Sequence, residues 1–184
     1  MSAATPIEDA SRPAFTSRKG SGETHTISLF VADKPGVLVR VALVFARRGY
    51  NIESLVVSPA KFEGFSRMTI TSSGDHATLQ QILKQLEKLV DVVHAIDHTD
   101  DATYETEIAL VKVECPAGAQ RSEILQIAEH FHARVVDYGN ESLILRVYGS
   151  SEKLDALILL LNDFQITELV RSGKIVMARG GAPT

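Results

Sequence analysis

The chain has 184 residues, and its 23 acidic and 19 basic side chains give a formal net charge of −4. Hydrophobic residues make up 45% and charged residues 23%, which is the balance of a globular protein and not of a disordered one. A single cysteine, Cys115, excludes a disulfide within the chain. The longest apolar runs cover six residues, whereas a membrane-spanning helix needs about 20. We therefore expect no membrane contact and, from the acidic charge, no nucleic-acid partner.

The two ends of the chain differ in composition from the rest. Residues 1–24 are dominated by Ser, Thr, Ala, Pro and Gly, and they contain no apolar segment of the kind that a secretory signal needs. We expect a disordered tail there and a cytoplasmic protein. Residues 180–184 are expected to fray.

The apolar pattern from residue 25 onward predicts alternating strands and helices. Strands are predicted where apolar residues alternate, and a first helix begins at Val37 and is stopped by Gly49. A second helix carries Leu79, Ile82, Leu83 and Leu86 at the spacing of one amphipathic face. The predicted strands are His25–Ala32, Tyr50–Ser58, Phe65–Ser72 and Leu89–Ile96. The order is βαββαβ, so residues 25–98 are expected to form one domain.

The same order recurs after a polar linker at residues 99–103. A strand is predicted over Glu105–Glu114, then a helix, two strands around Gly139-Asn140, a second helix and a final strand. We expect a second domain at 104–179. Each half is small for an independent core. The predicted fold class is α+β, with two ferredoxin-like βαββαβ sandwiches.

Catalytic motifs are absent from the sequence. It contains no phosphate-binding loop, no G-x-G-x-x-G after a strand and no nucleophile elbow. His94 and His98 lie near Asp97, Asp100 and Asp101, but histidines among solvated acids at a linker are far more common than a metal site. We therefore predict neither catalytic residues nor a metal site.

The junction between the first strand and the first helix is the most informative segment. Asp33-Lys34-Pro35-Gly36 ends in a glycine just before the helix. A helix N-terminus offers free N–H groups and the positive end of the helix dipole, which suit a carboxylate, and glycine lets a ligand approach the backbone. Asp33 would either contact an ammonium group or cap the helix.

These residues also carry a family resemblance. DKPGVL at residues 33–38, RRGYNIESL at 47–55 and SRMTI at 66–70 resemble an ACT domain. KQLEKLVDV at 84–92, EIALVKV at 107–113 and RSGKIVMARG at 171–180 resemble, more narrowly, the regulatory small subunit of acetolactate synthase.

The resemblance implies a non-catalytic subunit that stimulates a catalytic large subunit and confers feedback inhibition by valine or another branched-chain amino acid. It implies no cofactor on this chain, with thiamine diphosphate, Mg and FAD on the catalytic partner. It also implies a homodimer through ACT domains. The effector would contact Asp33, Gly36 and Val37 of one chain together with Asn51 and Ile52 of the other.

Other readings stay open at this point. An ACT-type sensor could serve another enzyme or act alone. An RNA-binding βαββαβ module would need stacking aromatic side chains on the central strands, where the sequence offers Phe30 and Phe65. The segment Arg171–Arg179 is a candidate contact with a catalytic partner or an ordinary edge hairpin.

Overall fold

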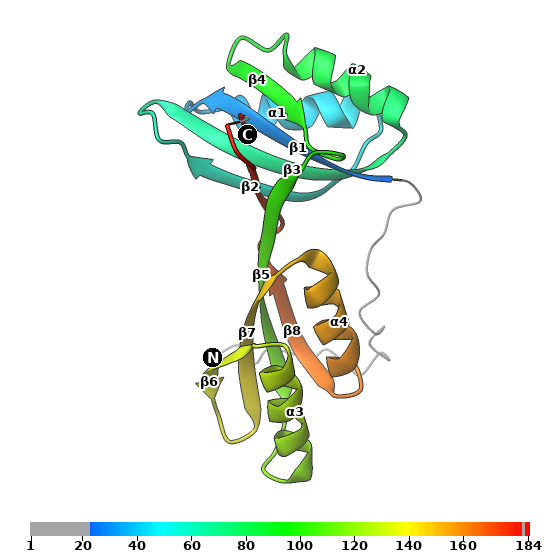
Figure 1. Cartoon of the computed structure of the whole chain (residues 1–184), viewed down its shortest axis with the longest axis vertical. Helices are drawn as coiled ribbons and strands as arrows, with labels where there is room; N and C mark the ends of the chain where they lie inside the picture. The colour runs from blue at the N-terminus through cyan, green and yellow to red at the C-terminus, as the bar shows by residue number, and fades with distance from the viewer. Residues whose placement is uncertain (1–22, 182) are drawn as a thin grey trace, which may run out of the picture.

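The computed structural model describes residues 23–181 and 183–184 and places them in two α+β units joined by one long strand (Figure 1). Most of the tail predicted at residues 1–24 lies outside the described residues. Its last two positions, Glu23 and Thr24, begin the first strand. Among the described residues, no helix combines the length and the apolar character needed to cross a membrane.

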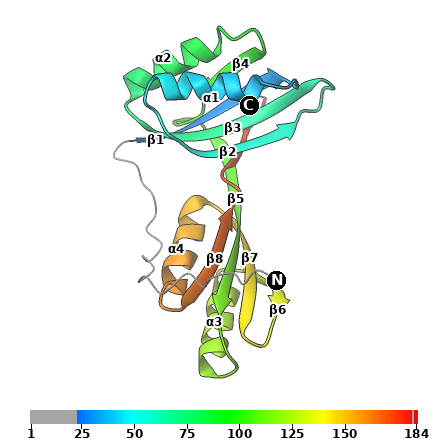
Figure 2. The ribbon, with the colours of Figure 1, turned by 180° about the vertical axis from the view of Figure 1, so that it is seen from behind.

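The first unit is an antiparallel sheet with two helices on one face (Figures 1 and 2). The strand order is β2-β3-β1-β4, which is the ferredoxin-like order predicted for a βαββαβ chain. Its elements are β1 (Glu23–Ala32), α1 (Val37–Arg47), β2 (Ile52–Pro59), β3 (Phe65–Gly74), α2 (His76–Leu86) and β4 (Val92–Asp97).

The second unit repeats this plan with the order β6-β7-β5-β8. A short extra strand, β9, pairs with the first part of β5. The linker expected at residues 99–103 lies between β4 and β5 and gives its last residue to β5. The elements are β5 (Thr103–Glu114), α3 (Ala119–His130), β6 (Arg134–Tyr138), β7 (Ser142–Gly149), α4 (Ser151–Leu161), β8 (Gln165–Arg171) and β9 (Ile175–Ala178).

The alternation of β1 determines how the first core is built. Ile27, Leu29 and Val31 are fully buried beneath the helices, as their spacing predicts. On the opposite face Thr26 and Ser28 are also buried, being only 3% and 2% exposed. This face therefore holds buried polar side chains that need hydrogen-bond partners.

The last strand of the first unit starts later than predicted. Leu89, expected in the strand, instead lies in a turn, where its N–H donates to Leu86 O and its carbonyl accepts from Val92 N. The strand proper begins at Val92. The prediction was wrong because apolar residues in a tight turn have the same local pattern as a short strand.

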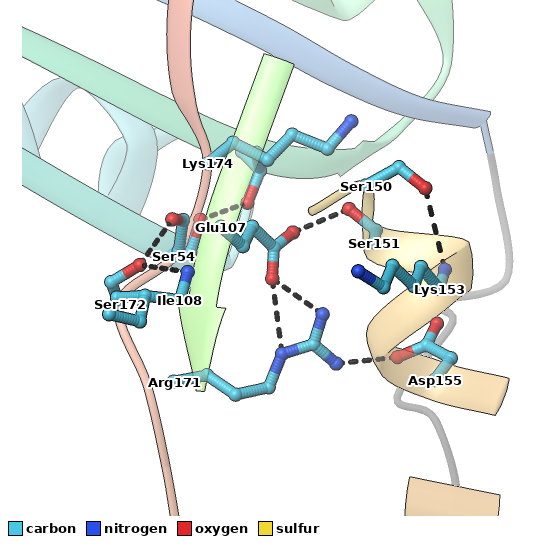
Figure 3. Close-up of polar contacts among 12 residues, drawn as sticks. Ser54, Glu107, Ile108, Ser150, Ser151, Lys153, Asp155, Arg171, Ser172 and Lys174 are labelled. Carbon is cyan, nitrogen blue, oxygen red and sulfur yellow. Dashed lines mark hydrogen bonds and ion pairs between the residues drawn. The ribbon is translucent and has the colours of Figure 1, made fainter. Parts of the chain in front are cut away.

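An ion-paired cluster closes the top of the second unit. Figure 3 shows the Glu107 carboxylate on β5 between Ser151 of α4 and Arg171 at the end of β8. Arg171 contacts one Glu107 oxygen through Nε at 3.1 Å and Nη2 at 2.5 Å, and it reaches Asp155 with Nη1 at 2.5 Å. Burial alone would lower the pKa of Arg171, but the bonds to Glu107 and Asp155 outweigh it and raise that pKa. Arg171 therefore stays charged in its half-buried position.

Directly after this cluster the chain crosses toward the first unit. Gly173 is buried and has a φ of +82°. A Cβ there would lie 2.7 Å from the Ser54 Cβ on β2. Lys174 then pairs with Glu105 at 2.7 Å, and β9 runs along β5. Thr184, in the segment expected to fray, accepts a hydrogen bond from Arg67 on β3. The last residues of the chain thus contact the sheet of the first unit.

We expect Gly173→Ala to separate the two units. Alanine at positive φ costs about 1–2 kcal/mol, and the contact with Ser54 adds an overpacking cost of about 1–3 kcal/mol unless the units move apart. Gly180→Ala is the control, because Gly180 has a similar φ of +69° with no atom near its Cβ position. Urea unfolding should show the larger loss for Gly173→Ala, partly rescued by Ser54→Gly. Equal losses for both alanine variants would contradict this contact.

Candidate functional site

The loop between β1 and α1 starts the helix at a left-handed glycine. Gly36 is the N-cap of α1 and adopts a left-handed conformation, with φ of 85° and ψ of −7°. The first helical hydrogen bond joins Arg40 N to Gly36 O at 3.1 Å. The N–H groups of the first helical turn therefore have no acceptor within the helix, and the positive end of the helix dipole points at the loop.

The structure bears on one of the two sequence-based roles of Asp33, the capping of α1. No side-chain cap hydrogen bond is formed at the N-terminus of α1, so Asp33 does not cap this helix. Its side chain is exposed, while its N–H donates to Gly64 O at 2.8 Å. The backbone of Asp33 is thus fixed, and its carboxylate is free to meet a cation.

Val37 occupies a different place from the other candidate residues. Its side chain is only 2% exposed and belongs to the core beneath α1. Its N–H makes a long 3.3 Å bond to Lys34 O. Any contact of Val37 with a ligand must therefore use the backbone amide and not the side chain.

The second group of candidate residues lies at the other end of α1. Asn51 is exposed and precedes β2, and Ile52 is half-buried at its start. A helix of 11 residues is about 16 Å long at 1.5 Å per residue. Within one chain, the structure does not bring Asn51 and Ile52 to the loop at Asp33–Gly36.

Tyr50 anchors this second group. Its ring packs over Gly74, where a Cβ would collide with the ring atoms. Its hydroxyl donates to the Asp75 carbonyl at 2.6 Å and also contacts Asp75 Oδ2 at 3.1 Å. Desolvation and the Asp75 carboxylate raise the pKa of Tyr50, whereas the N–H of Thr78 lowers the pKa of Asp75. Sequence reasoning missed this anchor because the contact joins distant segments.

The surroundings of both groups are apolar and accessible. α1 exposes Leu38 by 42%, Val39 by 61% and Leu43 by 46%. The neighbouring β2 is an edge strand that pairs only with β3 among the described residues. An edge strand beside apolar helix residues is a surface that can pair with another chain.

His98 forms a buried chain of contacts that resembles a catalytic triad in residue type. Ser28 Oγ lies 2.8 Å from His98 Nε2, and Asp101 Oδ2 lies 3.0 Å from His98 Nδ1. Ser28 and His98 are 2% and 1% exposed, so no substrate can reach the hydroxyl. These contacts hold the connection between the units against β1. His94, which lies close to His98 in the sequence, is not part of this network and stacks on Phe30 instead.

The aromatic side chains on the sheet are already engaged with one another. Phe30 stacks on Phe65 at 5.0 Å between ring centroids and on His94 at 5.3 Å. Arg67, whose guanidinium lies 5.5 Å from the Phe30 ring, also bonds Thr184. A nucleic-acid base would have to displace these contacts before it could stack.

The strand order β2-β3-β1-β4 and the glycine-started α1 are the features of an ACT-type domain. Consistent with this, residues 27–94 match the family described as the small-subunit-like ACT domain of AHAS. Residues 106–180 match the family described as the small subunit of acetolactate synthase. The chain belongs to the acetolactate synthase small subunit family.

Individual relatives agree with this assignment along nearly the whole described chain. A probable acetolactate synthase small subunit of Methanothermobacter thermautotrophicus is 47% identical over 158 residues, covering 86% of this chain and 94% of the relative. The small subunit of Mycobacterium bovis is 44% identical over 160 residues, covering 87% and 95%. The crystal structure of the small subunit from Thermotoga maritima has a TM-score of 0.77 at 37% identity, covering 86% of this chain and 99% of that one.

We expect Gly74→Ala to displace Tyr50, because the ring occupies the space of the new methyl group. Overpacking of this kind costs about 1–3 kcal/mol. Gly181→Ala is a matched control, since nothing lies near its Cβ position. The measurement is urea unfolding combined with a Tyr50→Ala cycle. If the cost of Gly74→Ala were the same with and without Tyr50, the proposed anchor would be wrong.

Proposed function

We propose that this chain binds the catalytic large subunit of acetolactate synthase, stimulates it and makes it sensitive to a branched-chain amino acid, chiefly valine. The observation that carries the proposal is the family match of both units, together with the two groups of candidate residues at opposite ends of α1. The match of the second unit favours this enzyme over a sensor for another one. The catalytic partner would carry thiamine diphosphate, Mg and FAD, and this chain would carry no cofactor and act in the cytoplasm.

The chemistry of the loop suits a free amino acid. The amides at the start of α1 would donate hydrogen bonds to the carboxylate, for which a helix-dipole contact contributes about 0.3–1 kcal/mol. The free Asp33 carboxylate would pair with the ammonium group. Burial of the valine side chain adds about 1.5–3 kcal/mol. The dipole and burial contributions sum to about 2–4 kcal/mol, which corresponds to an affinity no tighter than about millimolar, and pairing of the ammonium group would add to it.

A homodimer would complete the site. Pairing through the exposed β2 edge and the apolar side of α1 would bring Asn51 of the partner subunit and Ile52 of the partner subunit to the loop at Asp33–Gly36. The ligand would then contact two chains, so its binding energy would depend on the geometry of the dimer. A coupling of about 1–3 kcal/mol changes affinity for another partner by roughly five- to 150-fold.

We expect the purified chain to raise the rate of acetolactate formation by the matching catalytic subunit, and valine to reverse this increase. The assay compares the catalytic subunit alone, with this chain, and with this chain plus valine, leucine or isoleucine. Pull-down from native extract identifies the large subunit independently of the assay. An unchanged rate with no capture of that subunit would refute the proposal.

We expect Gly36→Asp to remove the response to valine while leaving stimulation intact. The new carboxylate would repel the carboxylate of the ligand at the start of α1, and Gly36 has a φ of +85° that disfavours any side chain. Gly180→Asp controls for an added charge at positive φ in an open place. Calorimetry with valine should show no binding to Gly36→Asp. Normal binding would disprove the assignment of the loop.

A further inference from the structure

A second cluster of polar residues lies in the first unit, away from the loop at the start of α1. His25 of β1, His76 at the start of α2 and Asp97 at the end of β4 each offer one ligand atom, and these atoms lie within 4.8 Å of one another. The rings of His25 and His76 are 6.2 Å apart between centroids. The residues are far apart in sequence, so no spacing motif indicates the cluster.

The register of the sheet brings two of the three residues to the same face. Asp97 pairs with Ile27, whose side chain lies in the core under the helices. His25 lies two residues before Ile27, so its side chain points to the same face. α2 covers that face, and its first residue is His76. The backbone therefore places the three residues close to one another.

The two ring nitrogens of His25 face different hydrogen-bond partners. Nε2 lies 3.1 Å from Gly74 O, which can only accept, so Nε2 carries the proton. Nδ1 lies 3.3 Å from Thr99 Oγ1, but that hydroxyl donates its only proton to Asp97 Oδ1 at 2.5 Å. Nδ1 thus faces a hydroxyl that is already engaged with Asp97, although His25 is fully buried.

This pattern is that of a metal-binding histidine. Such a histidine commonly donates its other N–H to a backbone carbonyl, which fixes the ring orientation, as Gly74 O does here. Asp97 is likewise held by the N–H of Thr99 at 3.0 Å. His76 is exposed and can rotate to close the site. Two imidazoles and one carboxylate suit zinc or a similar divalent transition metal, with a water at the remaining position.

We propose that His25, His76 and Asp97 form a binding site for a divalent transition metal ion, with zinc as the probe. The ion would join the start of β1, the start of α2 and the end of β4, so it would connect the entry of the chain into the first unit with its exit. The site contains neither the loop at Asp33–Gly36 nor Asn51. Its occupancy is therefore separable from the amino-acid response.

The test uses the full chain, stripped with a chelator and titrated with zinc by calorimetry and with cobalt by absorption spectroscopy. We expect about one ion per chain, intense visible bands of four-coordinate cobalt, and a higher melting temperature that a chelator reverses. His76→Ala should weaken binding by at least about 100-fold, since loss of even an outer-shell partner costs about 10–100-fold. His130→Ala, an exposed histidine on α3, should change nothing.

Two outcomes would overturn the proposal. One is zinc binding that His76→Ala leaves unchanged, or no binding at all, with folding of the variant verified by circular dichroism. The other is a nitrogen NMR spectrum at neutral pH that shows both ring nitrogens of His25 protonated in the presence of zinc. In that case the ring would be an imidazolium held by Thr99 and Gly74.

Discussion

The length of α1 is the constraint on which the proposed regulation depends. The helix places the loop at Asp33–Gly36 at one end and the start of β2 at the other, and its core residues Val37, Val41 and Phe45 fix it to the sheet. Because a packed helix cannot shorten, one chain cannot bring both groups to the same ligand. The proposed site would therefore need a second chain, and ligand binding and chain association would become linked equilibria.

The connection between the two units contains the first part of the long strand β5 and its short partner β9. β5 pairs with β9 over its first four residues and with β7 and β8 over the rest. The cluster of Glu107, Arg171 and Asp155 lies at that change of partner. Paired buried charges tolerate little change of geometry, because separating them leaves a charge without its partner. This cluster keeps β8 and α4 fixed to β5. A change of orientation between the two units would therefore bend the first part of β5 and its partner β9.

Sequence patterns predicted the order of elements well because each apolar face repeats locally, as with Leu79, Ile82 and Leu86 on α2. They failed where the decisive partner is distant. Leu89 was predicted in a strand, but its backbone hydrogen bonds place it in a turn. The burial of Thr26 and Ser28 depends on segments far along the chain. The turn at Asp33–Gly36 could be predicted because a glycine before a helix indicates a left-handed residue at the helix start. The cluster of His25, His76 and Asp97 depends on the sheet register and on the position of α2 over the sheet.

The two faces of the first sheet have different chemical characters, and this difference bears on how the unit can change shape. The face under the helices is filled by apolar side chains such as Leu29, Ile70 and Phe45, whose close packing resists displacement. The other face holds Ser28 and His98 in hydrogen bonds, and no buried side-chain polar atom among the described residues lacks a partner. Exchanging a protein hydrogen bond for a hydrogen bond to water has a small net cost in free energy, whereas opening a cavity in an apolar core has a large one. A shift between the units would therefore use the polar face and leave the helix-covered core, with α1 and its loop, unchanged.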